Sequence, residues 1–369
     1  MFRSPQAIDR GQVLAALRDV EDPELHRSIV DLDMVRDVRV RDGRVEVSAV
    51  LTIGACPLRE TIVERIRSRL QALPGVREVE VSLGVMTPEE RQALIGKLRG
   101  GPAAGGRRSP FLTPDSPTQV IAVASGKGGV GKSTVTVNLA AALRLAGFTV
   151  GVIDADVYGF SIPRMLGVTG RPTVIDQVIV PLERDGIRVI SIGFMLPHAD
   201  DAVIWRGPML HKALQTFIQE VHWGDDLAYL LIDLPPGTGD VAISIAQILP
   251  RSHMLIVTTP QPAAVEVAQR AAKMAAKVNM EVLGVIENMA GFVPAPGAPP
   301  VEIFGSGGGQ RLADLLEVPL LAQIPLDPAI REAGDRGTPL VLAAPDGPAA
   351  QAFRQVAARL AERLPARVA

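Results

Sequence analysis

One stretch of nine residues constrains the fold of this chain more than any other part of the sequence. It reads GKGGVGKST at 126–134, follows the apolar run VIAVAS at 120–125 and precedes a helical pattern from Val135 to Leu145. Glycines in such a loop let successive backbone N–H groups converge on phosphate oxygens, and the N-terminus of the following helix adds positive potential. A chance glycine-rich turn would not combine a strand, a helix and the GKS ending. The sequence therefore predicts a phosphate-binding P-loop.

The residues of this loop expected to bind the nucleotide are Gly126, Lys127, Gly128, Gly129, Val130, Gly131, Lys132, Ser133 and Thr134. We expect Lys132 to neutralise the β and γ phosphates and the Ser133 hydroxyl to bind Mg²⁺. Asp233 ends the apolar run YLLID, where a buried carboxylate would be costly without a cation to face. A water-mediated contact to Mg²⁺ would compensate that cost, so Asp233 is the second predicted magnesium residue.

The segment around the P-loop alternates buried apolar runs with stretches of helix length. The runs lie at 120–125, 149–154, 187–192, 229–233, 253–258, 282–287 and 319–324. Continuous rather than alternating hydrophobicity is typical of strands that helices cover on both faces. The predicted fold class is α/β, a doubly wound, mainly parallel sheet carrying the P-loop, with a smaller α+β domain before it.

The smaller domain is predicted for residues 1–97, because 369 residues exceed what one ordinary core accommodates. We expect a helix over Val13–Val20, strands at 35–40 and 44–51 joined by an Asp42-Gly43 hairpin, a helix over 58–73 and a strand over 76–83. Residues 98–117 are dense in Gly, Pro and Ser and are predicted to form a flexible linker. The P-loop domain is then 118–369.

Composition limits the partners. The chain has 38 Lys and Arg against 40 Asp and Glu, so no net field favours nucleic acid or an anionic membrane. We find no signal peptide and no run of about 20 apolar residues, and expect a cytoplasmic protein without a membrane partner. The one cysteine, Cys56, rules out an all-cysteine metal site within a single chain.

The second lysine of the loop refines the class. The form KGGVGKS at 127–133 resembles the deviant P-loops of MinD, ParA, nitrogenase iron protein and Mrp-type ATPases. In that class the extra lysine reaches across a dimer interface to the partner's nucleotide, which implies a homodimer and a catalytic role for Lys127 beside Lys132. The alternative is a Lys127 that is merely solvated on its loop.

The same resemblance assigns further residues. Asp156, in VIDADVYG, stands where this class carries switch I aspartates and is expected to orient or deprotonate the attacking water; N-capping of the next helix is the competing explanation for Asp154 and Asp156. Asn288 and Pro325 are expected to border the adenine, although both also suit simple turns. Switch II is expected to include Pro236, Gly237, Gly239 and Asp240.

Several longer stretches resemble the Mrp (ApbC-like) iron-sulfur carrier ATPases. They are GKGGVGKST, IDADVYGFSIPRMLG, WRGPMLHKALQTF at 205–217, WGDDLAYLLIDLPPGTGD and EIFGSGGG at 302–309. The first domain is similar to the small iron-sulfur assembly domain fused to bacterial Mrp proteins, through Asp22-Pro23-Glu24, 29–32 and 55–58. The resemblance implies a slow, Mg²⁺-dependent ATPase that acts on apo iron-sulfur client or assembly proteins.

This chain departs from the family at the cluster site. Members that carry a bridging [4Fe-4S] cluster have a CxxC between the residue matching Asn288 and the EIFGSGGG segment, but here Pro294 and Gly297 occupy those positions. Neither side chain can ligate iron. Cys56 is either a thiol contact for cluster transfer, activated at a helix N-terminus, or a plain buried cysteine.

Two functions therefore remain open, with a third further away. The first is an ATPase acting in iron-sulfur cluster assembly or transfer, and the second is an ATP-gated dimeric adaptor that carries no cluster itself. The third, a MinD/ParA-like positioning protein, would need a C-terminal amphipathic membrane helix, whereas Pro348–Pro365 predicts a helix that packs on its own domain.

Overall fold

The computed structural model describes residues 8–23, 25, 27–52, 58–98, 116–157, 159–176, 178–196, 207–237, 240–295 and 297–366. These residues form two compact units. The first contains the described residues up to 98 together with those of 173–180, and the second contains the remainder from 116 onward. The predicted linker lies largely outside the described residues, so its boundaries stay predictions. The inclusion of 173–180 in the first unit was not predicted.

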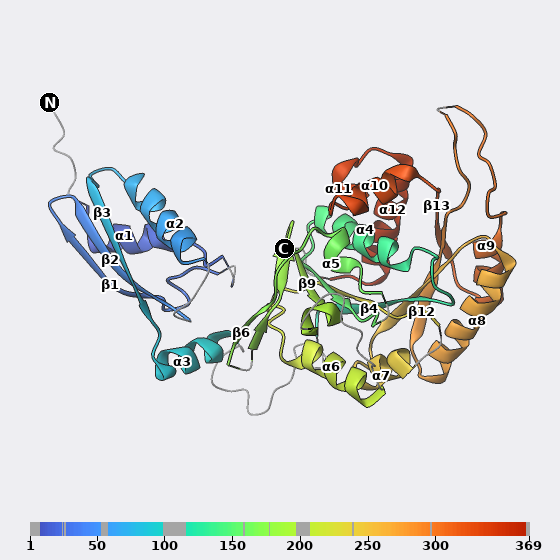
Figure 1. Cartoon of the computed structure of the whole chain (residues 1–369), viewed down its shortest axis with the longest axis horizontal. Coiled ribbons are helices and arrows are strands. Elements are labelled where there is room, and N and C mark those ends of the chain that lie inside the picture. The colour runs from blue at the N-terminus through green and yellow to red at the C-terminus, as the bar shows by residue number, and fades with distance from the viewer. Residues whose placement is uncertain are drawn as a thin grey trace. The chain divides into compact units, whose positions relative to one another are not determined.

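The first unit is a small three-stranded sheet with helices (Figure 1). Its elements are α1 (Arg10–Leu17), β1 (Val35–Arg41), β2 (Arg44–Leu51), α2 (Arg59–Gln71), β3 (Glu78–Val85) and α3 (Pro88–Leu98). Strands β1 and β2 are antiparallel, and α2 connects β2 to the parallel strand β3. Asp42 and Gly43 both have positive φ, 47° and 82°, which confirms the predicted tight hairpin.

Apolar residues at helical spacing place α2 on this sheet. Ile62, Ile66 and Leu70 are buried at intervals of four and share a core with β2. The short hairpin of β6 (Thr173–Ile175) and β7 (Val178–Val180) adds Ile175, Val178 and Val180 to the same core. Helix α3 was not predicted; its Glu89 and Glu90 lie in the first turn, where acidic side chains stabilise a helix.

The second unit is an eight-stranded sheet of described residues in the order β13-β12-β11-β4-β10-β5-β9-β8. Its strands are β4 (Gln119–Ser125), β5 (Val150–Asp154), β8 (Leu182–Arg184), β9 (Ile187–Ser191), β10 (Tyr229–Asp233), β11 (His253–Thr258), β12 (Glu281–Asn288) and β13 (Leu320–Ile324). All neighbours pair in parallel except β8 and β9, which are antiparallel. The predicted doubly wound, mainly parallel sheet is confirmed.

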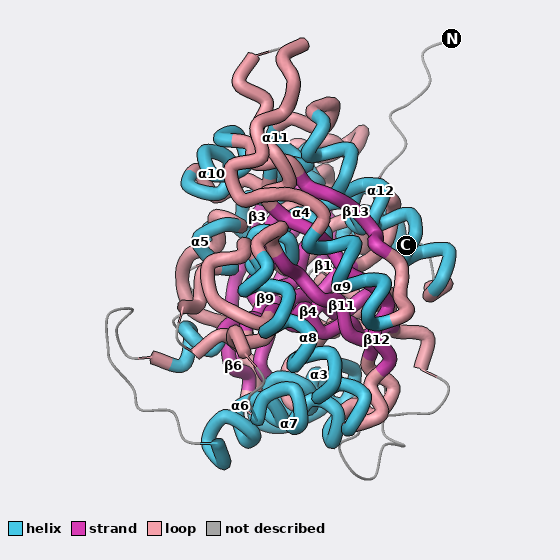
Figure 2. The backbone as a smooth tube through the Cα atoms, turned by 90° about the vertical axis from the view of Figure 1, so that its right-hand side faces the viewer, coloured by secondary structure: helices cyan, strands magenta, loops and turns pink. Residues whose placement is uncertain are grey.

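Helices cover both faces of this sheet (Figures 1 and 2). On one side lie α4 (Lys132–Leu145), α11 (Leu340–Ala343) and α12 (Pro348–Arg363); on the other lie α6 (Gly207–Gln219), α7 (Asp240–Ile248) and α8 (Pro262–Lys277). The remaining helical segments are α5 (Ile162–Met165), η2 (Ile192–Met195), α9 (Gly308–Leu316) and α10 (Pro328–Asp335). Phe353, Val356 and Leu360 of α12 are buried in the core, in agreement with the packing helix predicted for 348–365.

The parallel arrangement sets the position of the site. Strands β4, β5 and β10 are adjacent and run in the same direction, so Ser125, Asp154 and Asp233 all end their strands at one edge. Ligands of open α/β sheets bind at this carboxyl edge.

Candidate nucleotide site

The P-loop occupies residues 126–131, between the end of β4 and the start of α4. Gly129 and Gly131 have φ of 79° and 82°, in the left-handed region that favours glycine. Gly126 packs so closely on α8 that a Cβ would lie 2.3 Å from the backbone nitrogen of Ala268. Three of the loop's glycines are therefore required by backbone geometry, and the helix N-terminus faces the loop as an anion site requires.

Asp233 gathers three side chains of α4. Its Oδ2 accepts hydrogen bonds from the Lys132 amine and from the Ser133 hydroxyl, each at 2.6 Å, and its Oδ1 accepts from the Thr136 hydroxyl at 2.7 Å. Asp233 is fully buried and Lys132 is 6% exposed. The P-loop lysine and two hydroxyls therefore compensate this buried carboxylate, and the predicted water-mediated contact of Asp233 to Mg²⁺ stays a prediction.

Asp154, the last residue of β5, and Asp156, two residues after it, have different surroundings. Asp154 is fully buried; its carboxylate accepts from the backbone N–H of Asp156 and of Ile162, at 3.3 Å each, and from the Ser191 hydroxyl at 3.1 Å. Burial raises the pKa of Asp154 to about 8, and the carboxylate of Asp233 adds to the shift. Ile162 is the first residue of α5, so Asp154 accepts a hydrogen bond at the start of that helix, although the N-cap residue of α5 is Ser161 and not an aspartate.

Asp156 lies nearer the cation. Its Oδ2 is 3.6 Å from the Lys132 amine, and the residue is 8% exposed. Asp156 therefore lies beside the lysine that is predicted to hold the γ phosphate, and its role on the attacking water stays a prediction. Asp154, by contrast, is bonded to backbone N–H groups and to Ser191.

Lys127 points elsewhere. Its amine donates a 2.7 Å hydrogen bond to the side-chain oxygen of Gln261, the residue before α8. The carbonyl of Lys127 in turn accepts from the Ser125 hydroxyl at 3.1 Å. Lys127 is therefore held by its own chain at the rim of the loop.

The predicted switch II follows β10. The N–H of Gly237 donates to the carbonyl of Ser125 at 2.9 Å, and the φ of Gly237 is 100°. Pro236 is half-buried and faces Gly128, where an added Cβ would lie 4.0 Å from its ring. Asp240 is the first residue of α7, and Gly239 lies outside the described residues. The segment is thus adjacent to the P-loop, and its γ-phosphate response stays a prediction.

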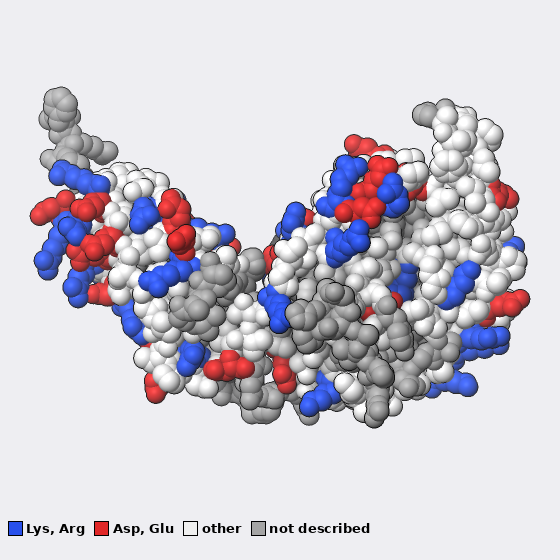
Figure 3. Space-filling model, viewed as in Figure 1, with Lys and Arg blue, Asp and Glu red and all other residues white. Residues whose placement is uncertain are grey.

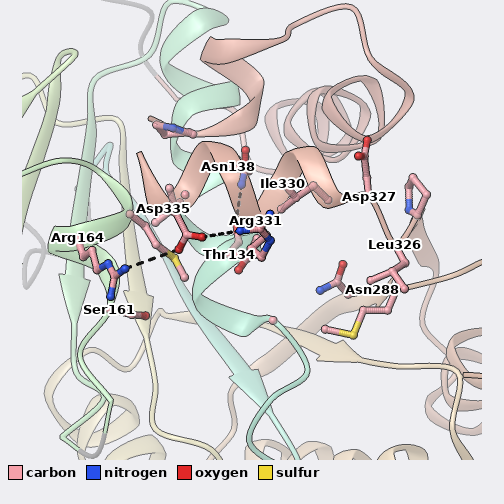
Figure 4. Close-up of a pocket in the computed structure, with 17 residues that line it drawn as sticks. Thr134, Asn138, Ser161, Arg164, Asn288, Leu326, Asp327, Ile330, Arg331 and Asp335 are labelled. Atoms are coloured by element: carbon pink, nitrogen blue, oxygen red, sulfur yellow. Dashed lines mark hydrogen bonds and ion pairs between the residues drawn. The ribbon is translucent and has the colours of Figure 1, made fainter. Parts of the chain in front are cut away.

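A pocket of about 320 Å³ opens beside the P-loop (Figure 4). Gly131, Thr134, Asn288 and Pro325 line it, so the structure brings both predicted adenine residues to one cavity with the loop. The Asn288 amide donates to the carbonyl of Val130 at 2.9 Å and so fixes the loop to the end of β12. The mouth carries an ion cluster in which Asp335 lies 2.9 Å from Arg331 and 3.8 Å from Arg164.

The loop at 289–307 projects beyond β12 and is largely without charged side chains (Figures 1 and 3). Phe292 and Val301 pair in an antiparallel bridge near its base. Pro294 and Gly297 are exposed, and Gly297 has a φ of 83° in a turn. The fully buried Glu287 accepts from the N–H of Gly309 and so joins the two ends of the loop. Cys56 lies outside the described residues.

The donors available for a magnesium ion fit its chemistry. Mg²⁺ prefers hard oxygen ligands and is commonly held by one or two protein groups together with phosphate oxygens and water. Ser133 and Asp233 offer a hydroxyl and a carboxylate that already meet at 2.6 Å. These two residues could hold the ion once Lys132 turns to a phosphate.

Two residues of the site were missed by the sequence reasoning. Thr136 follows Lys132 by four positions on α4, and that spacing alone places both on one helix face. Gln261 follows the carboxyl end of β11 by three residues, and the rule for the carboxyl edge of parallel sheets would have marked that loop.

The fold and this site define a P-loop NTPase with a second lysine in its loop. Among the described residues, no helix combines the length and apolarity needed to cross a membrane. Residues 116–361 match the family described as NUBPL iron-transfer P-loop NTPase, and residues 10–83 match the iron-sulfur cluster assembly protein family.

The chain belongs to this family of iron-sulfur carrier P-loop NTPases, with the assembly-type domain fused at its N-terminus. It is 49% identical to the iron-sulfur cluster carrier protein of Mycobacterium tuberculosis over 358 residues, which cover 95% of this chain and 93% of the relative. It is 42% identical to the protein of the same description from Synechocystis, over 95% of this chain and 97% of the relative.

Two solved structures share the fold of the second unit. One is a nucleotide-binding protein from Archaeoglobus fulgidus in complex with ADP, 38% identical with a TM-score of 0.52, covering 59% of this chain and 86% of the other. The second is the septum site-determining protein MinD from Pyrococcus horikoshii in complex with Mg-ADP, 25% identical with a TM-score of 0.51, covering 67% and 98%. Both the Mrp-type resemblance and the MinD/ParA-like class are confirmed.

Proposed function

We propose that this protein is a slow, Mg²⁺-dependent ATPase that dimerises around its nucleotide and acts in iron-sulfur cluster assembly or transfer. One observation carries the ATPase: the Lys132 amine and the Ser133 hydroxyl each lie 2.6 Å from Oδ2 of Asp233, at the carboxyl edge of a parallel sheet. Family membership supports the role in iron-sulfur metabolism.

Different residues would bind the phosphates, neutralise their charge and position the attacking water. The backbone N–H groups of the P-loop bind phosphate oxygens, and Lys132 leaves Asp233 to neutralise the β and γ phosphates. Asp156, which lies 3.6 Å from the Lys132 amine, holds the attacking water in line with the γ phosphate. Phosphoryl transfer depends mainly on such positioning, so an ordinary carboxylate serves.

Ser133 and Asp233 would hold the Mg²⁺ ion, and the ion would supply charge neutralisation between the β and γ phosphates. The Thr136 hydroxyl keeps Asp233 oriented through its Oδ1, so that Oδ2 stays directed at Ser133. Asn288 and Pro325 border the cavity proposed for adenine.

The second candidate is an ATP-gated adaptor that does not itself hold a cluster. The observation behind it is the loop at 289–307, in which Pro294 and Gly297 occupy the positions where the family resemblance places the cluster thiolates. A homodimer offers two Cys56 thiolates, and iron-sulfur clusters generally need four ligands, mostly cysteine. A cluster on this protein would therefore depend on ligands from a client or on small thiols.

Hydrolysis is tested by measuring phosphate release against Mg²⁺ concentration for the wild type, Asp156→Asn and Asp185→Asn. Asp185 is an exposed turn residue of the same unit and serves as the matched control. We expect Asp156→Asn to lower kcat by about 100-fold or more while ATP affinity changes little, and the control to match the wild type. Equal turnover in all three proteins would remove Asp156 from the mechanism.

The iron-sulfur role is tested by anaerobic reconstitution followed by gel filtration, iron and sulfide counting and an absorption spectrum. We expect the isolated dimer to retain fewer than about four irons, and the retained iron to fall further in Cys56→Ser. Transfer of a functional cluster to an apo client in the presence of ATP would favour the carrier over the adaptor. Stable retention of about four irons per dimer in both proteins would require non-cysteine ligands and overturn this account of the loop.

A further inference from the structure

The Lys127 amine is restrained by a neutral acceptor that no part of the proposed mechanism uses. Its 2.7 Å hydrogen bond runs to Gln261 Oε1, across 134 residues of sequence, and both side chains are partly buried. By contrast, the Lys132 amine pairs with carboxylates. The two lysines of one loop are therefore held by different means.

The backbone fixes Gln261 relative to the P-loop. Gln261 lies between Pro260 and Pro262, whose rings restrict φ, and its own ψ of 133° is the extended value favoured before proline. Pro260 packs on the start of α9, where a Cβ at Gly308 would lie 2.3 Å from the Pro260 carbonyl. The acceptor is thus on a rigid support.

The side chain of Gln261 does not serve its own helix. Gln261 is the N-cap residue of α8, but its side chain makes no capping hydrogen bond. Asp or Ser would be the usual choice for that task. The Gln261 side-chain oxygen is directed instead at the lysine of the adjacent loop.

We propose that Gln261 is a positioning residue that holds Lys127 within its own chain until a second copy presents its bound nucleotide. This rests on the proposed function, a dimer around its nucleotide, and on the family resemblance, which implies that Lys127 acts on the nucleotide of that second copy. A bond between an ammonium and a neutral amide orders the side chain, yet it is weaker than one between an ammonium and a phosphate anion. Lys127 therefore leaves Gln261 when the anion arrives and stays on it otherwise.

Substitutions of Gln261 can strengthen or weaken its contact with the Lys127 amine. Gln261→Glu turns the contact into an ion pair, so ATP-dependent dimerisation should weaken by about tenfold and turnover should fall with it. Gln261→Leu removes the acceptor at similar volume and should tighten dimerisation by about threefold. Gln351→Glu, on the exposed face of α12, introduces the same charge away from the site and is the matched control.

Sedimentation with a non-hydrolysable ATP analogue measures dimerisation, and calorimetry checks that each variant binds the analogue as wild type does. The labelling rate of Lys127 by an amine reagent, read by peptide mass spectrometry without nucleotide, should rise in Gln261→Leu and fall in Gln261→Glu. Both substitutions should lose their effects on dimerisation in a Lys127→Ala background. If Gln261 has only a structural role, its substitutions would leave the labelling rate of Lys127 unchanged, and their effects on dimerisation would persist in the Lys127→Ala background.

The outcomes separate this inference from the function on which it rests. If Lys127→Ala alone leaves dimerisation and turnover unchanged, the trans role of Lys127 is wrong and the inference fails with it. If Lys127→Ala impairs both but the Gln261 variants behave as wild type, the inference alone is overturned. Opposite shifts in the two Gln261 variants that vanish without Lys127 would support it.

Discussion

Removing the Lys132 amine should affect both nucleotide binding and the folded state. Lys132 is 6% exposed, and its amine lies 2.6 Å from the fully buried Asp233 and 3.6 Å from Asp156. Breaking a buried ion pair by removing one partner costs about 3–5 kcal/mol. For a unit of this size each kcal/mol lowers the melting temperature by about 2–4 °C, so Lys132→Ala should melt about 6–20 °C below wild type. ATP binding should be lost or become at least about 100-fold weaker.

The melting of the second unit can be followed by the fluorescence of Trp223, which is 2% exposed and packs on Gly151 of β5. Lys127→Ala is the matched control, because its amine pairs with a neutral amide and its loss should shift melting by a few degrees at most. The double variant Lys132→Ala/Asp233→Asn should melt above Lys132→Ala, since it removes the uncompensated carboxylate. If Lys132→Ala and the double variant both melt at the same temperature as the wild type, the ion pair does not stabilise this unit. Calorimetry showing unchanged ATP affinity would refute the P-loop assignment.

Three further predictions concern neighbouring groups. Lys127→Ala should keep nucleotide binding but slow ATP hydrolysis and weaken ATP-dependent dimerisation; equal turnover by phosphate release would make Lys127 a simple loop residue. Because the pKa of Asp154 is raised to about 8 in the folded state, its contribution to stability is complete below pH 4 and is lost as the pH rises through 8. Between these pH values the free energy of unfolding of the wild type should fall by up to about 1.4 kcal/mol per pH unit because of Asp154, and urea unfolding of Asp154→Asn should lack this fall. An unchanged pH dependence in Asp154→Asn would assign it to other groups. Pro294→Cys/Gly297→Cys should raise iron retention after anaerobic reconstitution; no gain over wild type would mean that the loop cannot bring thiolates together.

The strands of the second unit were predictable because each is covered on both faces. Runs such as YLLID are apolar throughout, and all five residues of β10 are buried. The P-loop was predictable for a different reason, since its glycines meet backbone requirements that leave a fixed spacing in the sequence. Both signals are local in the sequence, so both can be recognised without knowledge of the tertiary fold.

The short strands lacked such a signal. Strands β6, β7 and β8 have three residues each, too few for any periodicity to stand out. One clue was nonetheless available: Asp185-Gly186 joins β8 to β9 with φ of 53° and 75°, the same turn chemistry that located Asp42-Gly43. The contact of Gln261 with Lys127 had no local signal at all, because the two residues come together through the pairing of β11 with β4.

The shared use of Asp233 links the two ligands proposed for the site. Its Oδ2 already accepts from both Lys132 and Ser133, so a magnesium ion at Ser133 would compete with the lysine for the same oxygen. The competition is relieved when a phosphate offers Lys132 a stronger anionic partner. ATP without the metal would draw Lys132 away and leave the buried carboxylate with two hydroxyl donors but no cation, whereas the metal without ATP would meet an oxygen that Lys132 already occupies. Within the proposed function, this geometry therefore favours the binding of nucleotide and metal together.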